Sequence, residues 1–163
     1  MTFPMAKKYT NPQEALHLMY RFCSYRERAH NEVRTKLINM GVYGDKLEEI
    51  IAQLVSEGYL NEERYARAYV SGKFRIKQWG RRKILMGLKK QQIGEYAIRK
   101  GMTEIDDEEY EEVISKLIQK KMESSRITNQ FEKNKKVALF LAQKGFEPEL
   151  IWAKIKENEA YKP

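Results

Sequence analysis

Along the chain, the pattern of apolar and polar positions predicts short amphipathic helices separated by brief turns. Apolar residues recur three or four positions apart, as on one face of a helix. Most glycines stand just after such segments, where a residue in the left-handed conformation ends a helix. With only four prolines among 163 residues to interrupt them, these segments predict a chain that is nearly all helix.

Two cap signals place the first helix boundaries. The sequence NPQE at 11–14 supplies a cap, a proline at the first helical position and an acid at the third. SYRE at 24–27 has the spacing of a capping box. One helix is therefore expected to end near Cys23 and the next to begin at Tyr25. The second helix carries its apolar face on Ala29, Val33, Leu37 and Met40, and Gly41 ends it.

Seven further helices are predicted from the same signals. The third covers about 45–56, and the fourth follows a cap at Asn61 with one stripe on Tyr65, Tyr69, Gly72 and Ile76. The fifth spans 81–92, the sixth 95–102, and a long seventh begins after a cap at Asp106. The eighth precedes Gly145 and the ninth follows Pro148.

A repeat appears when the ends of the second, fifth and eighth helices are aligned as VRTKLINMGV, ILMGLKKQQI and VALFLAQKGF. Each has two apolar residues four apart, then a turn and another apolar residue. The anchoring residues Leu37, Leu88 and Leu141 stand at similar intervals. This predicts an all-α chain of three tandem three-helix repeats, at 11–60, 61–104 and 105–160. Gln92 stands where the other copies have glycine, and a non-glycine residue in the left-handed conformation costs roughly 1 kcal/mol. This turn is therefore expected either to be built differently or to be slightly strained.

The composition fits either a protein with an acidic partner or one whose solvated surface is simply basic. The net charge is +8, which favours encounters with polyanions. Cys23 is the single cysteine, so no disulfide can form within the chain, and a reducing cytoplasm is the expected compartment. The N-terminal segment lacks the apolar core of a secretory signal, and no run of eighteen apolar residues suggests a membrane span.

The sequence offers little for catalysis or metal binding. His17, His30 and Cys23 do not share a helix face with the spacing that a nucleophile and its base require. One cysteine and two separated histidines do not make a zinc site, and no phosphate-binding GxxxxGK occurs. The acids at 104–112 suit the N-terminal end of a helix better than a cation. The chain is therefore not expected to be an enzyme or to hold a metal or cofactor.

Basic residues gather between 73 and 100, where ten stand against the single acid Glu95. On the fifth helix four of them share a face with Met86 between them, while Ile84 and Leu88 lie opposite. This face predicts a partner or DNA-binding surface made of Arg82, Lys83, Lys89 and Lys90, with Arg75 and Lys77 adjoining.

Arginines of the second helix are secondary contact candidates. Arg28 has the spacing to pair with Glu32, and Glu27 offsets Arg34, so this helix is interpreted first as structural. Trp79, at the boundary of the fourth and fifth helices, is interpreted as a packing anchor. The predicted structural anchors are Tyr65, Tyr69, Trp79, Leu37, Leu88 and Leu141.

Three segments, YRERAHNEVRTKLINMG, LVSEGYLNEERYARAYV and WGRRKILMGLKKQQI, together resemble the RecX family of bacterial regulators of the RecA recombinase. The likeness spans about 24–105 and is most specific at EGYLNEERYARAYV. It implies a curved, elongated body that binds along the groove of the RecA filament on single-stranded DNA and inhibits its ATPase, strand-exchange and coprotease activities, with the chain expected to act as a monomer. The alternative is a helical protein that binds single- or double-stranded DNA directly.

Overall fold

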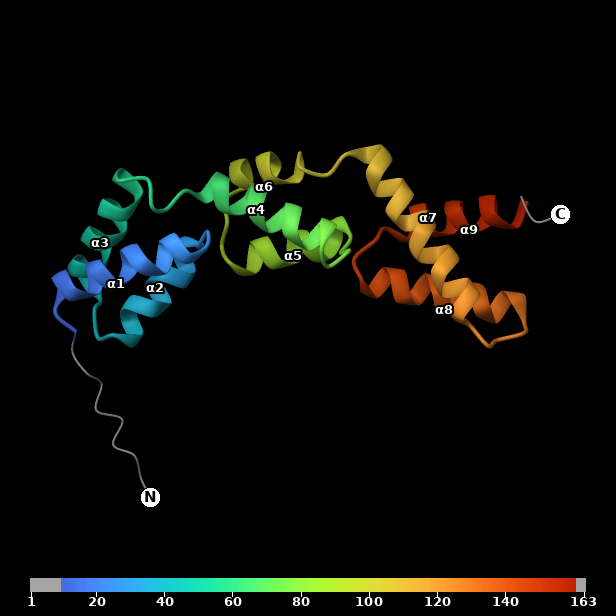
Figure 1. Cartoon of the computed structure of the whole chain (residues 1–163), viewed down its shortest axis with the longest axis horizontal. Helices are drawn as coiled ribbons and strands as arrows, with labels where there is room; N and C mark the ends of the chain where they lie inside the picture. Colours follow the sequence, from blue (N-terminus) through green and yellow to red (C-terminus); the bar gives the residue numbers. More distant parts are fainter. Residues whose placement is uncertain (1–9, 161–163) are drawn as a thin grey trace, which may run out of the picture.

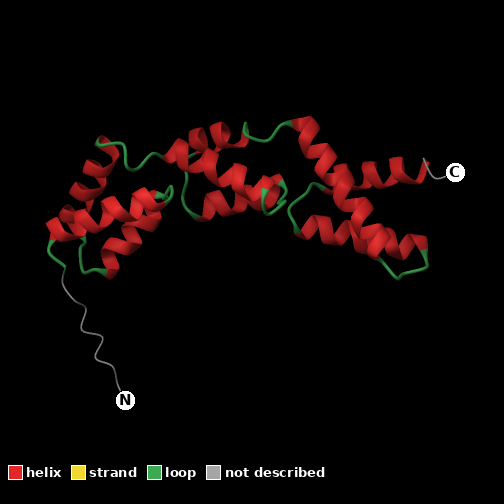
Figure 2. Cartoon of the chain, in the orientation of Figure 1, coloured by secondary structure: helices red, strands yellow, loops and turns green. Residues whose placement is uncertain are grey.

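A computed structural model describes residues 10–160, which form nine α-helices in a curved, elongated array (Figure 1). The helices are α1 Pro12–Tyr25, α2 His30–Asn39, α3 Gly44–Ser56, α4 Glu62–Arg75, α5 Arg81–Lys90, α6 Glu95–Met102, α7 Asp107–Ser124, α8 Gln130–Gln143 and α9 Pro148–Ala160. In this part of the chain there are helices and loops but no strands (Figure 2). The prediction of an all-α array of three-helix repeats is confirmed. The expected absence of a secretory signal concerns mainly residues 1–9, which lie outside the described part.

Polar caps begin several helices where the sequence predicted them. The Asn11 side chain accepts a hydrogen bond from the Gln13 N–H at 2.8 Å, and the Asp106 carboxylate accepts one from Glu109 at 3.0 Å. Asn61 accepts from the N–H three residues further along α4. Each cap satisfies an N–H group that the first helical turn leaves without a backbone partner.

The capping box predicted at SYRE is wrong. α1 continues past Ser24, whose hydroxyl donates to the Tyr20 carbonyl at 2.6 Å, and α2 begins only at His30. A serine inside a helix commonly bonds the carbonyl four residues back. At the start of α2, the Glu32 carboxylate accepts a hydrogen bond from the N–H of the N-cap residue Ala29 at 2.8 Å.

The same turn follows the second helix of every repeat. Gly41, Gln92 and Gly145 all have positive φ, at 81°, 59° and 98°. In each repeat the next residue donates its N–H to the carbonyl of the anchoring leucine: Val42 to Leu37 at 2.9 Å, Ile93 to Leu88 at 3.2 Å and Phe146 to Leu141 at 3.2 Å. Of the two alternatives at Gln92, the structure has the left-handed turn, with the same hydrogen bond as its glycine counterparts.

The stripe predicted for α4 is wrong at its C-terminal end, because Ile76 is 80% exposed. α4 ends at Arg75, and its buried face comprises Tyr65, Ala66, Val70 and Phe74. The reason is the close approach of α6: a Cβ atom added to Gly101 would come within 2.9 Å of Ala66. This contact turns α4 so that its buried face centres on Ala66.

Two separate hydrophobic cores hold the array together. The first lies among α1–α3 and includes Met19, Leu37 and Leu54. The second is continuous through α4–α9 and includes Phe74, Leu88, Tyr110, Leu141 and Phe146. Ala29, at the start of α2, belongs to the second core rather than the first. The first repeat therefore packs largely on itself, while the second and third share one interior.

Backbone contact joins the second and third repeats. The Gly80 N–H donates to the Lys144 carbonyl at 2.8 Å, and the Arg82 N–H donates to the Gly145 carbonyl at 3.0 Å. A Cβ atom on Gly80 would overlap the backbone of Gly145. Because these two backbone segments approach this closely, only glycine fits at position 80.

Around this contact, Arg81 joins the repeats through a polar network. Its guanidinium lies 2.5 Å from an Asp107 oxygen and 3.5 Å from a Glu147 oxygen, and it stacks 3.9 Å from the Tyr110 ring centroid. The Tyr110 hydroxyl donates to Glu147 at 2.5 Å and accepts from the Arg81 backbone N–H. Burial and the Glu147 carboxylate raise the pKa of Tyr110, so its hydroxyl keeps its proton and remains a donor.

Cys23 is buried in the first core, with 8% of its surface exposed. Burial raises the pKa of its thiol from 9.0 to about 11. Since the thiolate is the reactive form, we expect a thiol reagent at pH 8 to label the native chain far more slowly than the urea-unfolded chain. Because burial disfavours the thiolate, the fold is more stable below pH 9.0 and loses stability as the pH rises through about 11. Equal rates of thiol labelling in the native and the urea-unfolded chain would contradict the burial of Cys23.

Candidate partner-binding surface

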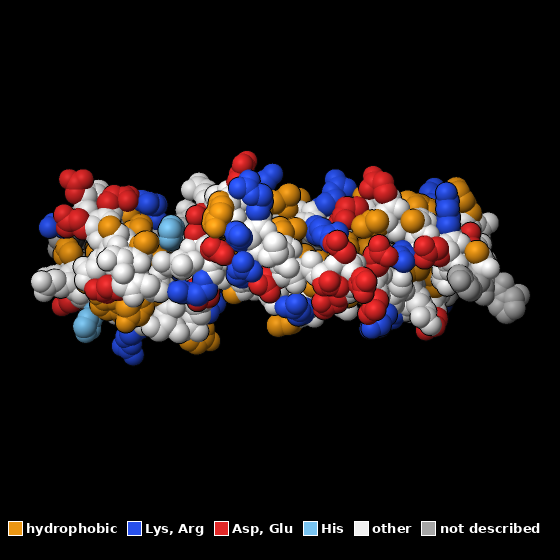
Figure 3. All heavy atoms as spheres, turned by 90° about the horizontal axis from the view of Figure 1, so that it is seen from above, with side chains coloured by type: hydrophobic (Ala, Val, Ile, Leu, Met, Phe, Trp, Pro, Cys, Tyr) orange, Lys and Arg blue, Asp and Glu red, His pale blue; other side chains and the backbone are white. Residues whose placement is uncertain are grey.

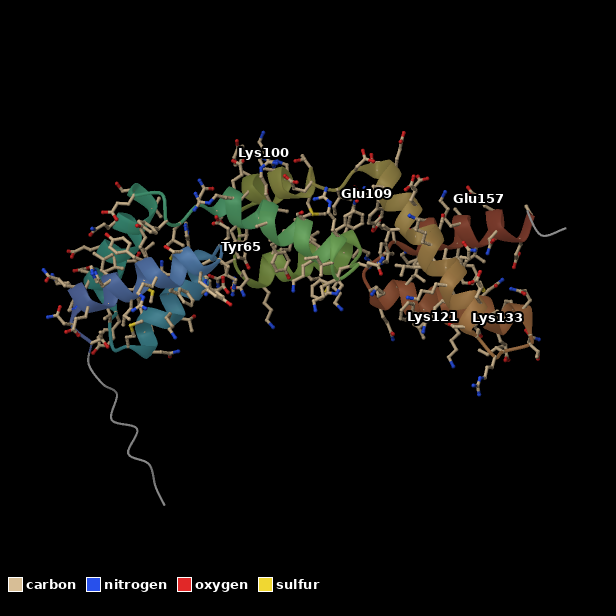
Figure 4. All side chains as sticks on the ribbon, in the orientation of Figure 1. Tyr65, Lys100, Glu109, Lys121, Lys133 and Glu157 are labelled. Carbon is tan, nitrogen blue, oxygen red and sulfur yellow. The ribbon has the colours of Figure 1, made fainter. Side chains whose placement is uncertain are left out.

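The second helices of the three repeats, α2, α5 and α8, lie along one side of the array, the lower side in Figure 1. Figure 4 shows Lys121 and Lys133 on this side, and Lys100 and Glu109 on the opposite one. Figure 3 looks onto the opposite side, where carboxylates and cations are mixed and acids gather over the right half. The charge of the lower side is therefore taken from its individual residues.

On α5 the predicted binding residues are available to a partner. Arg82, Lys89 and Lys90 are exposed, and Lys83 is half-buried. Met86 is 70% exposed, whereas Ile84 and Leu88 are fully buried. Within residues 10–160, none of these four cations forms an ion pair. Their charge is therefore not neutralised by the chain itself.

Trp79 lies beside Lys83 of α5 and Lys73 of α4. The Lys83 Nζ lies 4.3 Å from the Trp79 ring centroid, and the Lys73 Nζ lies 4.6 Å from it. An ammonium group over an indole is attracted by the electrons of the ring. Trp79 is half-buried, so it both packs against the second core and holds these two lysines in place.

Lys144 brings a third charge to this group from the end of α8. Its Nζ donates to the Lys77 carbonyl at 3.3 Å. The pKa of Lys144 is lowered, first by desolvation and then by the positive charge of Lys83. We name Lys73, Lys83 and Lys144, with Trp79, the Trp79 cluster. Because its cations repel one another, a bound anion would relieve that repulsion.

The remaining predicted residues differ in their surroundings. Lys77 is exposed beside the Trp79 cluster and forms no ion pair within residues 10–160. Arg75 is engaged within the chain, donating to Ser71 at 2.6 Å and to the Glu104 carbonyl at 3.1 Å, and lying 3.7 Å from Glu109. Arg75 therefore ties α4 to the start of the third repeat.

Ion pairs predicted in the first repeat are wrong. Glu32 pairs with Arg26, not with Arg28, at 2.6 Å. Arg28 donates to the Phe22 carbonyl at 2.9 Å and stacks 3.7 Å from that ring centroid. Because α2 begins only at His30, Arg28 lies in the loop between α1 and α2, and this contact returns the loop to α1.

Two other partners in this region lie further along the chain. Arg34 pairs with Glu48 of α3, and Glu27 pairs with Arg64 of α4 at 2.5 Å. Arg28 and Arg34 are thus occupied by contacts within the chain. The second of these pairs joins the first repeat to the next.

Sequence reasoning missed a set of cations on the third repeat. Lys135 and Lys136 are exposed on α8, Arg126 is exposed in the α7–α8 loop, and Lys121 is half-buried near the end of α7. None of the four forms an ion pair in the described part of the chain. The repeat alignment contained the signal, because it placed α8 in the position equivalent to α5.

Within residues 10–160, no three His, Cys, Asp or Glu side chains are grouped as a metal ion would require. No helix in that range has the length and apolar character needed to cross a membrane.

Comparison with known proteins identifies both the helical units and the whole fold. The family model of the second three-helix domain of RecX matches residues 61–102, and that of the third matches residues 107–155. A crystal structure of RecX from Lactobacillus salivarius has a TM-score of 0.82 at 23% identity, covering 91% of this chain and 97% of the other.

Two proteins that are similar to this chain in sequence share the description "Regulatory protein RecX". A "Regulatory protein RecX" from Lactobacillus johnsonii is 30% identical over 69% of this chain and 41% of its own length. Another, from Pelodictyon phaeoclathratiforme, is 25% identical over 84% of both chains. The chain thus spans less than half of the first relative and most of the second.

The fold is that of a helical repeat protein, and the α5 cations form no ion pair within residues 10–160. The two family models together match more than half of the sequence, and this chain belongs to the RecX family.

Proposed function

We propose that this chain binds the RecA filament assembled on single-stranded DNA and inhibits its ATPase, strand-exchange and coprotease activities. The observation that carries the proposal is the row of unpaired cations on α5, Arg82, Lys83, Lys89 and Lys90, in a member of the RecX family. A filament wrapped around DNA presents dense negative charge. An extended cationic side suits such a groove, because opposite fields raise the association rate and fix the orientation.

The α5 face supplies more than charge. Met86 is a flexible apolar side chain that stands between the cations, and such residues adapt to irregular partner surfaces. Trp79 holds Lys83 in position before a partner arrives, so less conformational entropy is lost on binding. The face therefore combines long-range attraction with short-range contact.

A second function, direct binding of single- or double-stranded DNA, is favoured by the same unpaired cations, because lysines and arginines neutralise phosphates without reading sequence. If the four α5 cations contact phosphates of a single strand, the logarithm of the affinity should fall with the logarithm of salt concentration with a slope of about −3. Titration of labelled oligonucleotides at several salt concentrations measures this slope.

The primary test is the ATPase activity of a preformed filament. We expect the chain, added at or below the concentration of RecA, to slow ATP hydrolysis, and the effect to weaken as salt rises because surface charges are screened. The measurement is the steady rate of ATP hydrolysis against the concentration of added chain. An unchanged rate at low salt would rule out the proposed inhibition.

A further inference from the structure

A pocket of about 450 Å³ lies between the end of α7, the following loop and α8. Its lining combines cations, hydroxyl groups and apolar side chains: Lys121, Ser124, Ser125, Arg126, Ile127, Lys136, Val137, Leu139, Phe140 and Gln143. The lining contains no carboxylate. A pocket of this composition attracts anions.

Three cations give the pocket its charge. Lys121, Arg126 and Lys136 come from α7, the loop and α8 in turn, and none has an ion-pair partner within residues 10–160. The Lys121 Nζ is held 4.2 Å from the Phe140 ring centroid. The carbonyl end of α7 carries about half a negative charge, which three full positive charges outweigh.

Hydroxyl groups add directional hydrogen bonds. The Ser125 oxygen accepts from the Ile127 N–H at 3.3 Å, so its own hydrogen remains available to a ligand. The Ser124 hydroxyl donates to the Lys121 carbonyl at 3.2 Å, which satisfies one of the free carbonyls at the end of α7. A guanidinium at Arg126 can form two parallel hydrogen bonds to a phosphate.

The remaining wall is apolar, formed by Ile127, Val137, Leu139 and Phe140. A pocket in the range of small-molecule sites, about 300–1,000 Å³, is larger than a bare phosphate needs. The apolar wall suits a flat ring that shares the site with the anion. A carboxylate of an acidic peptide carries no ring, and its negative charge is smaller than that of a phosphate monoester.

We propose that this pocket binds one nucleotide unit, with the phosphate on Lys121, Arg126 and Lys136 and the base against the apolar wall. The nucleotide comes either from a free monophosphate or from a strand of nucleic acid. The proposal extends the proposed function by giving the third repeat its own nucleotide contact, and it is measured without RecA. If the pocket does not bind a nucleotide, the proposal that the whole chain inhibits the filament ATPase is unaffected.

The test uses the full chain with thymidine 5′-monophosphate, thymidine, pentathymidylate and a decaglutamate peptide. We expect the monophosphate and the oligonucleotide to shift the amide resonances of residues 121–127 and 136–143, and thymidine to do so far more weakly because it lacks the phosphate. Binding of pentathymidylate alone would identify a strand as the source, and binding of the monophosphate alone would identify the free nucleotide. No shift with either ligand, or equal shifts with decaglutamate, would overturn the proposal.

Paired variants locate the site. Arg126→Gln with Lys136→Gln should weaken binding by about tenfold or more, because two charge-assisted contacts are lost. The matched control, Lys120→Gln with Lys156→Gln, removes the same charge from exposed residues of α7 and α9 that do not line the pocket. The control should change the affinity by less than about twofold, since it removes only long-range attraction. Equal losses in both pairs would show general electrostatic attraction and overturn the assignment.

Discussion

Replacing Arg82, Lys83, Lys89 and Lys90 together by glutamate is expected to abolish binding to the filament. These side chains lie on one helix, are unpaired within the described residues, and are wholly or partly exposed. Their replacement reverses the charge of the α5 face and leaves its buried residues unchanged. The fold should therefore survive while the attraction becomes repulsion.

The size of the effect follows from the charges. If each cation contributes about 0.5 kcal/mol of attraction and each glutamate adds similar repulsion, four replacements change the binding free energy by about 4 kcal/mol. That is nearly a thousandfold in affinity. ATPase inhibition and oligonucleotide binding, measured on the same preparations, report the two affinities.

A matched variant separates position from total charge. Arg99, Lys116, Lys120 and Lys156 are exposed cations outside α2, α5 and α8, and their replacement by glutamate makes the same change in net charge. We expect it to retain most of the inhibition. If the α5 variant still inhibits the filament but no longer binds oligonucleotides, then the α5 face contacts DNA and another surface contacts RecA. If both variants lose equal affinity, the α5 face is not a defined site.

Gly80→Ala is expected to lower the free energy of unfolding by about 3 kcal/mol, a large effect for one methyl group. The added Cβ would overlap the backbone of Gly145, and that backbone cannot move without breaking the two hydrogen bonds that join the second and third repeats. Gly80 has φ of −78°, a conformation open to alanine, so the loss comes from contact and not from backbone strain. Urea unfolding followed by circular dichroism measures the change.

Gly72→Ala is the control for this substitution. Gly72 lies within α4, and a Cβ there would meet no atom within 4 Å. Alanine should stabilise the helix by about 0.5–1 kcal/mol, because glycine loses more backbone freedom on folding. Similar stability for the two variants would mean that the repeats do not meet at Gly80.

Local signals in the sequence predicted the helices and the repeat, because caps, turns and apolar spacing act over a few residues. The sequence left open whether the turn at Gln92 is built like those at Gly41 and Gly145, and in the structure it has their geometry. The stripe ending at Ile76 was wrong because the close packing of α6 on α4 decides which face is buried. The spacing of residues along one helix does not show which other helix packs most closely against it.

The ion pairs show the same limit. Arg81 bonds Glu147, which is 66 positions away, and Arg64 bonds Glu27, which is 37 positions away. Such partners are set by the way successive repeats meet. The unpaired cations of α5 were easier to predict, since a run of positive residues with almost no acid nearby leaves few partners within reach.

The placement of α2, α5 and α8 along one side has a consequence for how the chain distinguishes its targets. The contacts proposed for α5 and for the third repeat would act multivalently, because the first attachment raises the effective concentration of the other. A polymer offers repeated sites at successive positions, whereas a dissociated subunit offers one. Such avidity would let weak individual contacts select the assembled polymer over its free subunits.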